Sequence, residues 1–293
     1  MPSLAGSEQR EATGRHALLV AAGIMLSRLF GVVRTSVFAY FFGIQSDAAD
    51  AFNTAFRIPN FLQNLFGEGV LSASFIPVYA RLLKEGDDEE SGRVAGAVGA
   101  ILALAVAAIV LLGVLFTPLF IDAIAVGYHG AKRDLIIRLV RILFPGAGCF
   151  AMGAWCLGIL NSHRRFFLSY SASVAWNIAM IATLVGFGHR RDEVSLTIVL
   201  AWGSVVGSAL VFLVQLPHVL RLVKRLRIRL DTKDPQVREV VRNFGPVFIS
   251  RGVGQSSAYI DTLLATLLPT GGITGLVNAQ NIFMLPVSLF GMS

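Results

Sequence analysis

Charged residues are scarce in this sequence. Asp, Glu, Lys and Arg make up 15% of its 293 residues, whereas soluble domains usually carry about 25%. Hydrophobic residues make up 55%, and the mean hydropathy is +0.68. A chain of this length could not cover a soluble core that held so many apolar side chains. The composition therefore excludes an ordinary soluble domain and predicts a membrane protein.

Cysteine and enzyme signatures are also nearly absent. The two cysteines, Cys149 and Cys156, lie seven residues apart in one apolar run and hence near one helix face. They form neither a disulfide framework nor a local metal motif, so we interpret them as small packing residues. The sequence contains no HExxH, GxSxG, Walker A or CxxC pattern. We therefore predict no enzymatic activity, no cofactor and no metal site.

Long apolar runs make up most of the sequence. A run of about 20 apolar residues spans a bilayer. No removable signal peptide is evident, because the first apolar run continues to about residue 42 and is too long for a signal sequence. We expect an all-α polytopic membrane protein with about eight transmembrane helices, over residues 17–42, 50–80, 94–120, 137–160, 167–187, 195–219, 243–268 and 272–293.

Lys and Arg gather in the connectors on one side of the predicted bundle. With a cytoplasmic N-terminus, the inside segments hold 15 of these residues and the outside segments hold 4. Cytoplasmic loops carry such an excess, so the sequence predicts the N-in orientation. The same bias accounts for the net charge of +7 without a nucleic-acid partner. The basic connector 220–242 fits either an amphipathic segment on an anionic leaflet or an ordinary solvated loop.

A short internal sequence repeat suggests how the chain is organised. Residues 56–59 (FRIP) resemble residues 283–286 (FMLP), and a Phe-Gly pair follows each motif. Either the eighth helix just reaches the far interface, or span seven begins a second copy of a six-helix unit, as in many transporters. The second interpretation predicts a cytoplasmic segment 1–16, a first lobe 17–219, a connector 220–242 and two helices of a truncated second lobe, 243–293.

Three arginines lie within the first two predicted spans. Arg28 is near the middle of span one, Arg34 follows six residues later, and Arg57 precedes Pro59 in span two. An arginine at the bilayer centre costs about 2.5–3.5 kcal/mol on insertion scales, so it usually faces protein or a water-filled cavity. On a straight helix Arg28 and Arg34 would lie on different faces, about 120° apart. A surplus of guanidinium groups indicates an anionic ligand such as phosphate.

Few acidic groups accompany these arginines. Asp50 begins span two, and Glu68 lies deep in it, where it could offset part of the cost of burying Arg28 or Arg34. Arg251 and Asp261 form a second set in span seven, too far apart along a helix to pair with each other. A purely structural role remains the alternative for all these groups, as internal ion pairs or as side chains that reach the headgroups.

Several motifs can be compared with known families. They are SRLFGVVR at 27–34, FG at 42–43, DAF at 50–52, RIPN at 57–60, EG at 68–69, FIPV at 75–78, RILFP at 141–145 and GILN at 158–161. Together they resemble the front of the MurJ/MviN lipid II flippases, within the multidrug/oligosaccharidyl-lipid/polysaccharide exporter superfamily. The similarity runs from about residue 17 to 293, and the block from 27 to 78 is the most specific.

The resemblance implies a fold and a function. Members of the family have about fourteen spans in two lobes around a central cavity, so this chain would cover the first lobe and the start of the second. They move the undecaprenyl-pyrophosphate-linked peptidoglycan precursor to the outer leaflet of the bacterial cytoplasmic membrane by alternating access. Membrane lipids are implied as further partners, and coupling to a monovalent ion is compatible with the resemblance. By position, Arg28 and Arg34 match the cavity arginines that are thought to hold the pyrophosphate and headgroup. Asp50 matches the acidic position after the first outer loop, and Arg57 takes a position that is basic in the family.

Two positions depart from the family's pattern. Gln63 and Asn64 stand where members often have an arginine, and Asn281 stands where a functional arginine precedes the proline of span eight. Either this branch holds its substrate differently, or the substrate is a related lipid-linked sugar. A multidrug exporter of the superfamily and an inactive truncated fragment are the alternatives. The excess of basic residues in the first two spans argues against export of organic cations.

Overall fold

The computed structural model describes residues 3–43, 45–66, 68–125 and 127–291. Within these ranges its side chains are not described at 3–21, 62–63, 66, 68, 124, 255–259, 262, 282 and 284–291. The described residues form twelve α-helices, one 3-10 helix and no strand. The expectation of an all-α membrane fold is confirmed. Five helical segments are long and apolar enough to cross a membrane: Ala22–Phe42, Asp88–Leu115, Gly130–Ser162, Phe166–Arg190 and Glu193–Leu222.

Each of the eight predicted spans corresponds to a helix or to a broken run of helices. Five are single helices: α1 (Ser3–Phe42), α7 (Gly130–Ser162), α10 (Glu193–Leu222), α11 (Pro235–Ala265) and α12 (Gly272–Gly291). The other three are divided, into α2 (Asp47–Phe66), α3 (Glu68–Ser74) and α4 (Ile76–Glu85), into α5 (Asp88–Leu115) and α6 (Thr117–Ile124), and into α8 (Phe166–Ser171) and α9 (Ser173–Phe187).

Proline accounts for two of these breaks. Pro77 and Pro118 stand in the first turns of α4 and α6. A proline fits the first turn of a new helix, where its missing N–H needs no partner. Hydropathy is insensitive to such breaks, so the sequence predicted one continuous span in each case.

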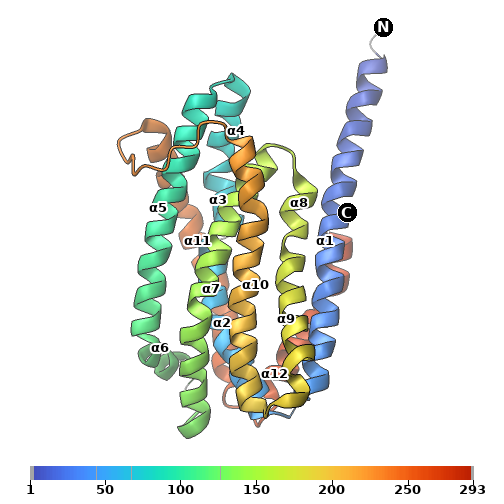
Figure 1. Cartoon of the computed structure of the whole chain (residues 1–293), viewed down its shortest axis with the longest axis vertical. Helices are drawn as coiled ribbons and strands as arrows, with labels where there is room; N and C mark the ends of the chain where they lie inside the picture. The colour runs from blue at the N-terminus through green and yellow to red at the C-terminus, as the bar shows by residue number, and fades with distance from the viewer. Residues whose placement is uncertain (1–2, 44, 67, 126, 292–293) are drawn as a thin grey trace.

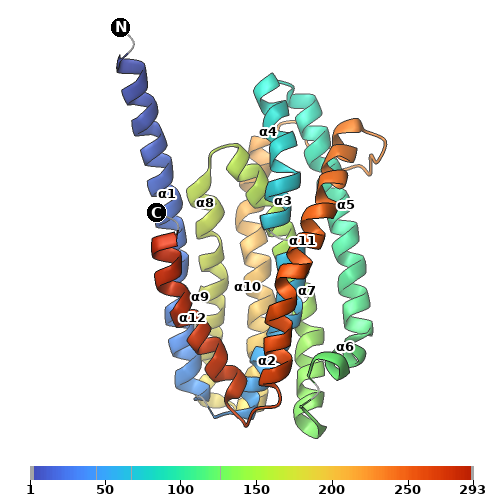
Figure 2. The same cartoon turned by 180° about the vertical axis from the view of Figure 1, so that it is seen from behind.

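Helix α7 lies at the centre of the bundle, packed mainly against α10, α2 and α5. In Figure 1 α5, α7 and α10 run side by side, while Figure 2 shows α11 and α12 on the opposite face. The N-terminal end of α1 projects beyond the other helices in both views. Two apolar clusters fill the interior, one around Ile136 and Leu200, the other around Tyr79 and Ile159. The helices α1, α2, α9 and α12 thereby come together around a shared space.

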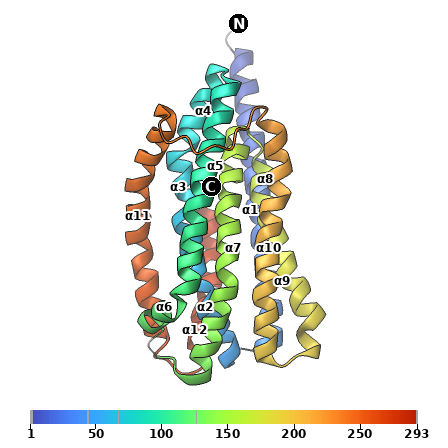
Figure 3. The same cartoon turned by 60° about the vertical axis from the view of Figure 1, so that its left-hand side comes forward.

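The connector between α10 and α11 is an irregular strap that crosses the first turns of α5 (Figure 3). Lys224 pairs with Asp88 at 3.1 Å, and Arg225 pairs with Glu89 at 2.9 Å. The amide of Arg227 donates to the Gly92 carbonyl at 3.5 Å. The strap is therefore bound to α5, while most of its residues from Lys224 to Leu230 remain exposed.

Gly96 of α5 allows the backbone of this strap to pack closely against the helix. A Cβ atom there would lie 2.1 Å from the carbonyl oxygen of Arg227, closer than real Cβ contacts allow. Gly96→Ala is expected to lower stability by about 1–3 kcal/mol, as other overpacked sites do, measured as thermal unfolding in detergent. Gly186→Ala is the matched control, because nothing lies within 4 Å of a Cβ at that helical glycine. Equal melting temperatures for the two variants would contradict close packing of the strap against Gly96.

Candidate functional site

A cavity of about 300 Å³ lies between α1, α2, α9 and α12. These helices stand next to one another in Figure 2. Aromatic and aliphatic side chains form part of the wall, and polar side chains form the rest. The lining residues are Arg34, Thr35, Phe38, Phe52, Asn53, Phe56, Arg57, Asn60, Phe61, Asn64, Trp176, Met180, Val277, Asn278, Gln280 and Asn281.

The polar part of the wall is cationic and rich in amides. It holds two arginines, Arg34 and Arg57, and six amides contributed by α2 and α12. No Asp or Glu is among the described residues that line the cavity. Four of the polar residues, Asn53, Arg57, Asn60 and Asn64, follow the helical spacing i, i+4, i+7 and i+11, which places them on one face of α2. The cavity therefore offers positive charge and neutral hydrogen-bonding groups to an occupant.

Arg34 stands at membrane depth in this wall. It lies eight residues before the end of α1, a rise of about 12 Å along the helix axis. Its guanidinium carbon is 4.6 Å from the centre of the Trp176 ring of α9. A cation over an aromatic face is attracted by the ring's quadrupole. The structure thus gives this guanidinium an uncharged partner.

Arg57 joins α2 to α12, two helices of the wall that are far apart in the sequence. It lies in α2, and its Nη2 donates to Oε1 of Gln280 in α12 at 3.2 Å. Asn53, one turn earlier, donates to the Thr274 hydroxyl at 3.2 Å. These contacts hold α12 beside α2, and both use neutral acceptors. The positive charge of Arg57 is therefore not cancelled by these two contacts.

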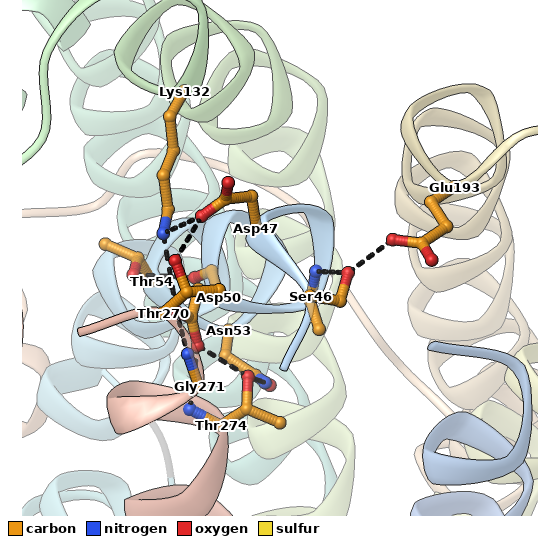
Figure 4. Close-up of polar contacts among 11 residues, drawn as sticks. Ser46, Asp47, Asp50, Asn53, Thr54, Lys132, Glu193, Thr270, Gly271 and Thr274 are labelled. Atoms are coloured by element: carbon orange, nitrogen blue, oxygen red, sulfur yellow. Dashed lines mark hydrogen bonds and ion pairs between the residues drawn. The ribbon is translucent and has the colours of Figure 1, made fainter. Parts of the chain in front are cut away.

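Asp50 closes the end of the α2–α12 contact at which both helices begin (Figure 4). Its side chain is buried, with 1% exposed, and it accepts hydrogen bonds from the amides of Gly271 and Thr274 at 2.8 and 3.0 Å. The Thr274 hydroxyl donates to it at 2.7 Å, and the Lys132 ammonium lies 3.4 Å away. A carboxylate at this place satisfies free amides at the start of α12 and complements the helix dipole.

Lys132 and Asp47 extend this polar cluster toward the surface (Figure 4). The ammonium of Lys132 lies 2.7 Å from Asp47, and Thr270 donates to the same carboxylate at 2.9 Å. The hydrogen bond from Lys132, and then that from Thr270, hold the pKa of Asp47 below its ordinary value. This cluster, which comprises Asp47, Asp50, Lys132, Thr270 and Thr274, is called the α2–α12 latch below.

The comparisons with known proteins support one family. The family model described as "Lipid II flippase MurJ" matches residues 38–293. The chain belongs to the lipid II flippase MurJ family. A relative described as lipid II flippase MurJ from Burkholderia cenocepacia is 32% identical over 285 residues, which cover 94% of this chain and 54% of the relative. A probable lipid II flippase MurJ from Aquifex aeolicus is 30% identical, covering 95% and 54%.

Solved structures agree with this assignment. A lipid II flippase MurJ in an inward closed conformation matches with a TM-score of 0.77 at 26% identity, covering 94% of this chain and 56% of that one. A transporter of the MOP superfamily from Pyrococcus furiosus matches with a TM-score of 0.68 at 19% identity, covering 95% and 61%, and shares the fold. The chain spans about half the length of the curated MurJ relatives it matches.

The structure distributes the residues that the sequence suggested for a MurJ site over several places. Arg34, Arg57 and Asn281 line the cavity, and Asp50 belongs to the α2–α12 latch. Arg28 is exposed on α1 and is not among the residues that line the cavity. The side chain of Glu68 lies outside the described residues.

The two residues suggested on α11 also lie apart from the cavity. Arg251 and Asp261 are exposed, and the guanidinium of Arg251 packs directly over Gly69 of α3. Neither is among the described lining residues. The contact between Arg251 and Gly69 therefore packs α11 against α3.

Sequence reasoning missed three features of this MurJ-family site. The amide stripe on α2 could have been found, because its spacing is helical and uncommon in an apolar span. Trp176 and Lys132 carried no such signal. Each lies more than 80 residues from its partner in the chain, so only the folded bundle brings them together.

Proposed function

We propose that this chain carries the anion-binding cavity of a flippase that moves lipid II, a pyrophosphate-linked peptidoglycan precursor, from the inner to the outer leaflet. The observation that carries the proposal is the cavity wall. It holds Arg34 and Arg57 and no carboxylate among its described residues. Guanidinium groups bind phosphate oxygens bidentately, and they do so more strongly where water is scarce. The family assignment supports the same substrate class.

The amides of the cavity suit the rest of such a headgroup. Sugars and peptides present hydroxyl, acetamido and amide groups, each of which needs a hydrogen-bond partner when it leaves water. Asn and Gln offer both donors and an acceptor. In this proposal the arginines hold the pyrophosphate, the amides hold the neutral part of the headgroup, and the polyprenyl chain stays in the lipid.

The proposed transport works by alternating access with the N-terminus in the cytoplasm. The excess of Lys and Arg in the inside connectors supports this orientation. In this orientation the α2–α12 latch lies on the outer side. Opening toward that side would require its hydrogen bonds to break. Residues 17–219 would form the first lobe, and residues 243–293 would begin the second.

The proposed activity involves no chemical step. Members of transporter families move a ligand whose covalent structure is unchanged, so the cavity needs binding groups that can also release the ligand. Arg34, which lies against an aromatic ring, and Arg57, which donates to the neutral side chain of Gln280, are such groups. Organic cations fit the cavity poorly, because a positive wall repels them.

Binding of a charged lipid by the purified chain tests the proposal. The chain in nanodiscs is expected to bind undecaprenyl pyrophosphate, and to bind uncharged undecaprenol at least about tenfold more weakly, because charge-assisted hydrogen bonds contribute about 1.5–3 kcal/mol. The two lipids share their apolar chain, so the comparison isolates the pyrophosphate. Equal affinities would contradict an anion-binding cavity.

Growth provides the second test. Expression of the chain in a bacterium depleted of its own MurJ-family flippase is expected to restore growth and to expose lipid II at the outer surface. Immunoblotting of the membrane fraction confirms that the chain is inserted. An inserted chain that restores neither growth nor surface lipid II would contradict flipping by this chain alone.

A further inference from the structure

Trp176 is held firmly at the wall of the cavity. Its indole N–H donates to the hydroxyl of the buried Ser204 at 3.0 Å. The Phe56 ring stacks with it at 5.5 Å between centroids, and Phe150 meets it at a steep angle at 5.9 Å. A Cβ on Gly207 of α10 would lie 2.8 Å from the indole Cδ1, so this glycine makes room for the ring. Three helices besides its own therefore fix the ring.

The guanidinium of Arg34 rests against this fixed ring, with its Cζ 4.6 Å from the centroid. We infer that Trp176 is the positioning residue of Arg34, and that its aromatic face holds the guanidinium at membrane depth while leaving its charge and N–H donors for an anionic headgroup. The inference rests on the proposed function and names a residue through which the binding group acts.

An aromatic partner differs from a carboxylate in what it leaves available. A carboxylate would pair with the guanidinium through two hydrogen bonds, cancel its charge and compete with a phosphate for the same N–H groups. A ring attracts the cation through its quadrupole and accepts none of these hydrogen bonds in the ordinary sense. No acidic residue is among the described residues that line the cavity, so the ring provides the attraction that a carboxylate would otherwise provide.

The ring also counteracts the tendency of the arginine to leave the cavity. A long arginine side chain in a membrane helix extends its head toward the nearest headgroups. Arg34 is about 12 Å of helix from the end of α1, so such a movement would carry the charge away from Arg57 and the amides. A fixed ring at one wall restrains the side chain at the depth where the other polar groups lie.

A double-mutant cycle between Trp176 and Arg34 tests the inference. The readout is the affinity of the chain in nanodiscs for undecaprenyl pyrophosphate. Trp176→Leu is expected to weaken binding by about 2- to 30-fold, the range that cation–π contacts supply, and Trp176→Phe by less, because phenylalanine keeps a ring. In an Arg34→Ala chain the same Trp176→Leu change is expected to alter affinity by less than about twofold, because positioning needs the group that is positioned.

Two further variants separate positioning from general stability. Trp202→Leu is the matched control, because Trp202 on α10 is 56% exposed, and its removal is expected to leave affinity unchanged. Ser204→Ala removes the acceptor of the indole N–H and is expected to weaken binding in the same direction with a smaller loss of folding. This variant decides the question if Trp176→Leu does not fold.

Three results would overturn the inference. They are an unchanged affinity in both Trp176→Leu and Ser204→Ala, an equal loss from Trp176→Leu with and without Arg34, and a loss from Trp202→Leu as large as that from Trp176→Leu. A wild-type chain that binds undecaprenyl pyrophosphate no better than undecaprenol would instead contradict the proposed function, and the inference would fall with it. The first comparison of lipids therefore distinguishes the two failures.

Discussion

Arg34→Ala is expected to reduce the affinity for undecaprenyl pyrophosphate by about 10- to 100-fold and to stop transport. The side chain supplies charge-assisted hydrogen bonds, each of which contributes about 1.5–3 kcal/mol when its partner is otherwise unsatisfied. Arg34→Lys keeps the charge but loses the planar guanidinium group that can bind phosphate bidentately, so its loss of affinity is expected to be smaller than that of Arg34→Ala. Arg34→Glu places a negative charge opposite the ligand and is expected to be the most damaging of the three. Lipid binding in nanodiscs and rescue of flippase-depleted cells measure the series.

The matched control for this series is Arg229→Ala. Arg229 is exposed on the strap between α10 and α11, away from the residues that line the cavity. Its loss removes one positive charge from the chain as Arg34→Ala does, and is expected to leave lipid binding unchanged. A graded loss over lysine, alanine and glutamate at position 34 supports a direct electrostatic role. Full binding by Arg34→Glu would contradict it.

Asp50→Asn is expected to be the most destabilising single change in the α2–α12 latch, by about 3 kcal/mol. Asparagine has nearly the same shape as aspartate, but it leaves the start of α12 with a weaker acceptor and Lys132 without its buried partner. Removal of one member of a buried ion pair typically costs 3–5 kcal/mol. The lower end applies here, because Lys132 keeps its contact with Asp47 at 2.7 Å. Thermal unfolding in detergent measures the loss.

Asp47→Asn is the control for Asp50→Asn. The Asp47 side chain is 68% exposed, and exposed ion pairs contribute about 0–1 kcal/mol. Both variants remove one carboxylate that faces the same lysine, so the difference between them reports the burial of Asp50 together with its bonds to the start of α12. Hydrogen exchange at the amides of Gly271 and Thr274 is expected to increase in Asp50→Asn and to change little in Asp47→Asn. Equal effects of the two variants would contradict the latch as described.

Much of this protein could be predicted because hydrophobicity is a local property of the chain. Each apolar run became helical whatever its neighbours did, since a backbone in lipid must satisfy its hydrogen bonds within the segment. The cost of placing Arg34 and Arg57 in such runs was equally local, and so were the motifs that indicated the MurJ family. The helix breaks at Pro77 and Pro118 were missed because the expected spans followed hydropathy alone.

The sequence by itself determined that the chain is a polytopic membrane protein of the MurJ family with arginines at membrane depth. Only the tertiary structure decided that Arg34 and Arg57 line the cavity while Arg28 does not. It also decided that Asp50 binds the start of α12, 221 residues away, and that the guanidinium of Arg34 lies against the Trp176 ring. These outcomes depend on which helix faces meet, and that depends on contacts between segments far apart in the chain. A pattern within one segment fixes the helix and the spacing of its faces, but it does not fix the neighbour that each face will find.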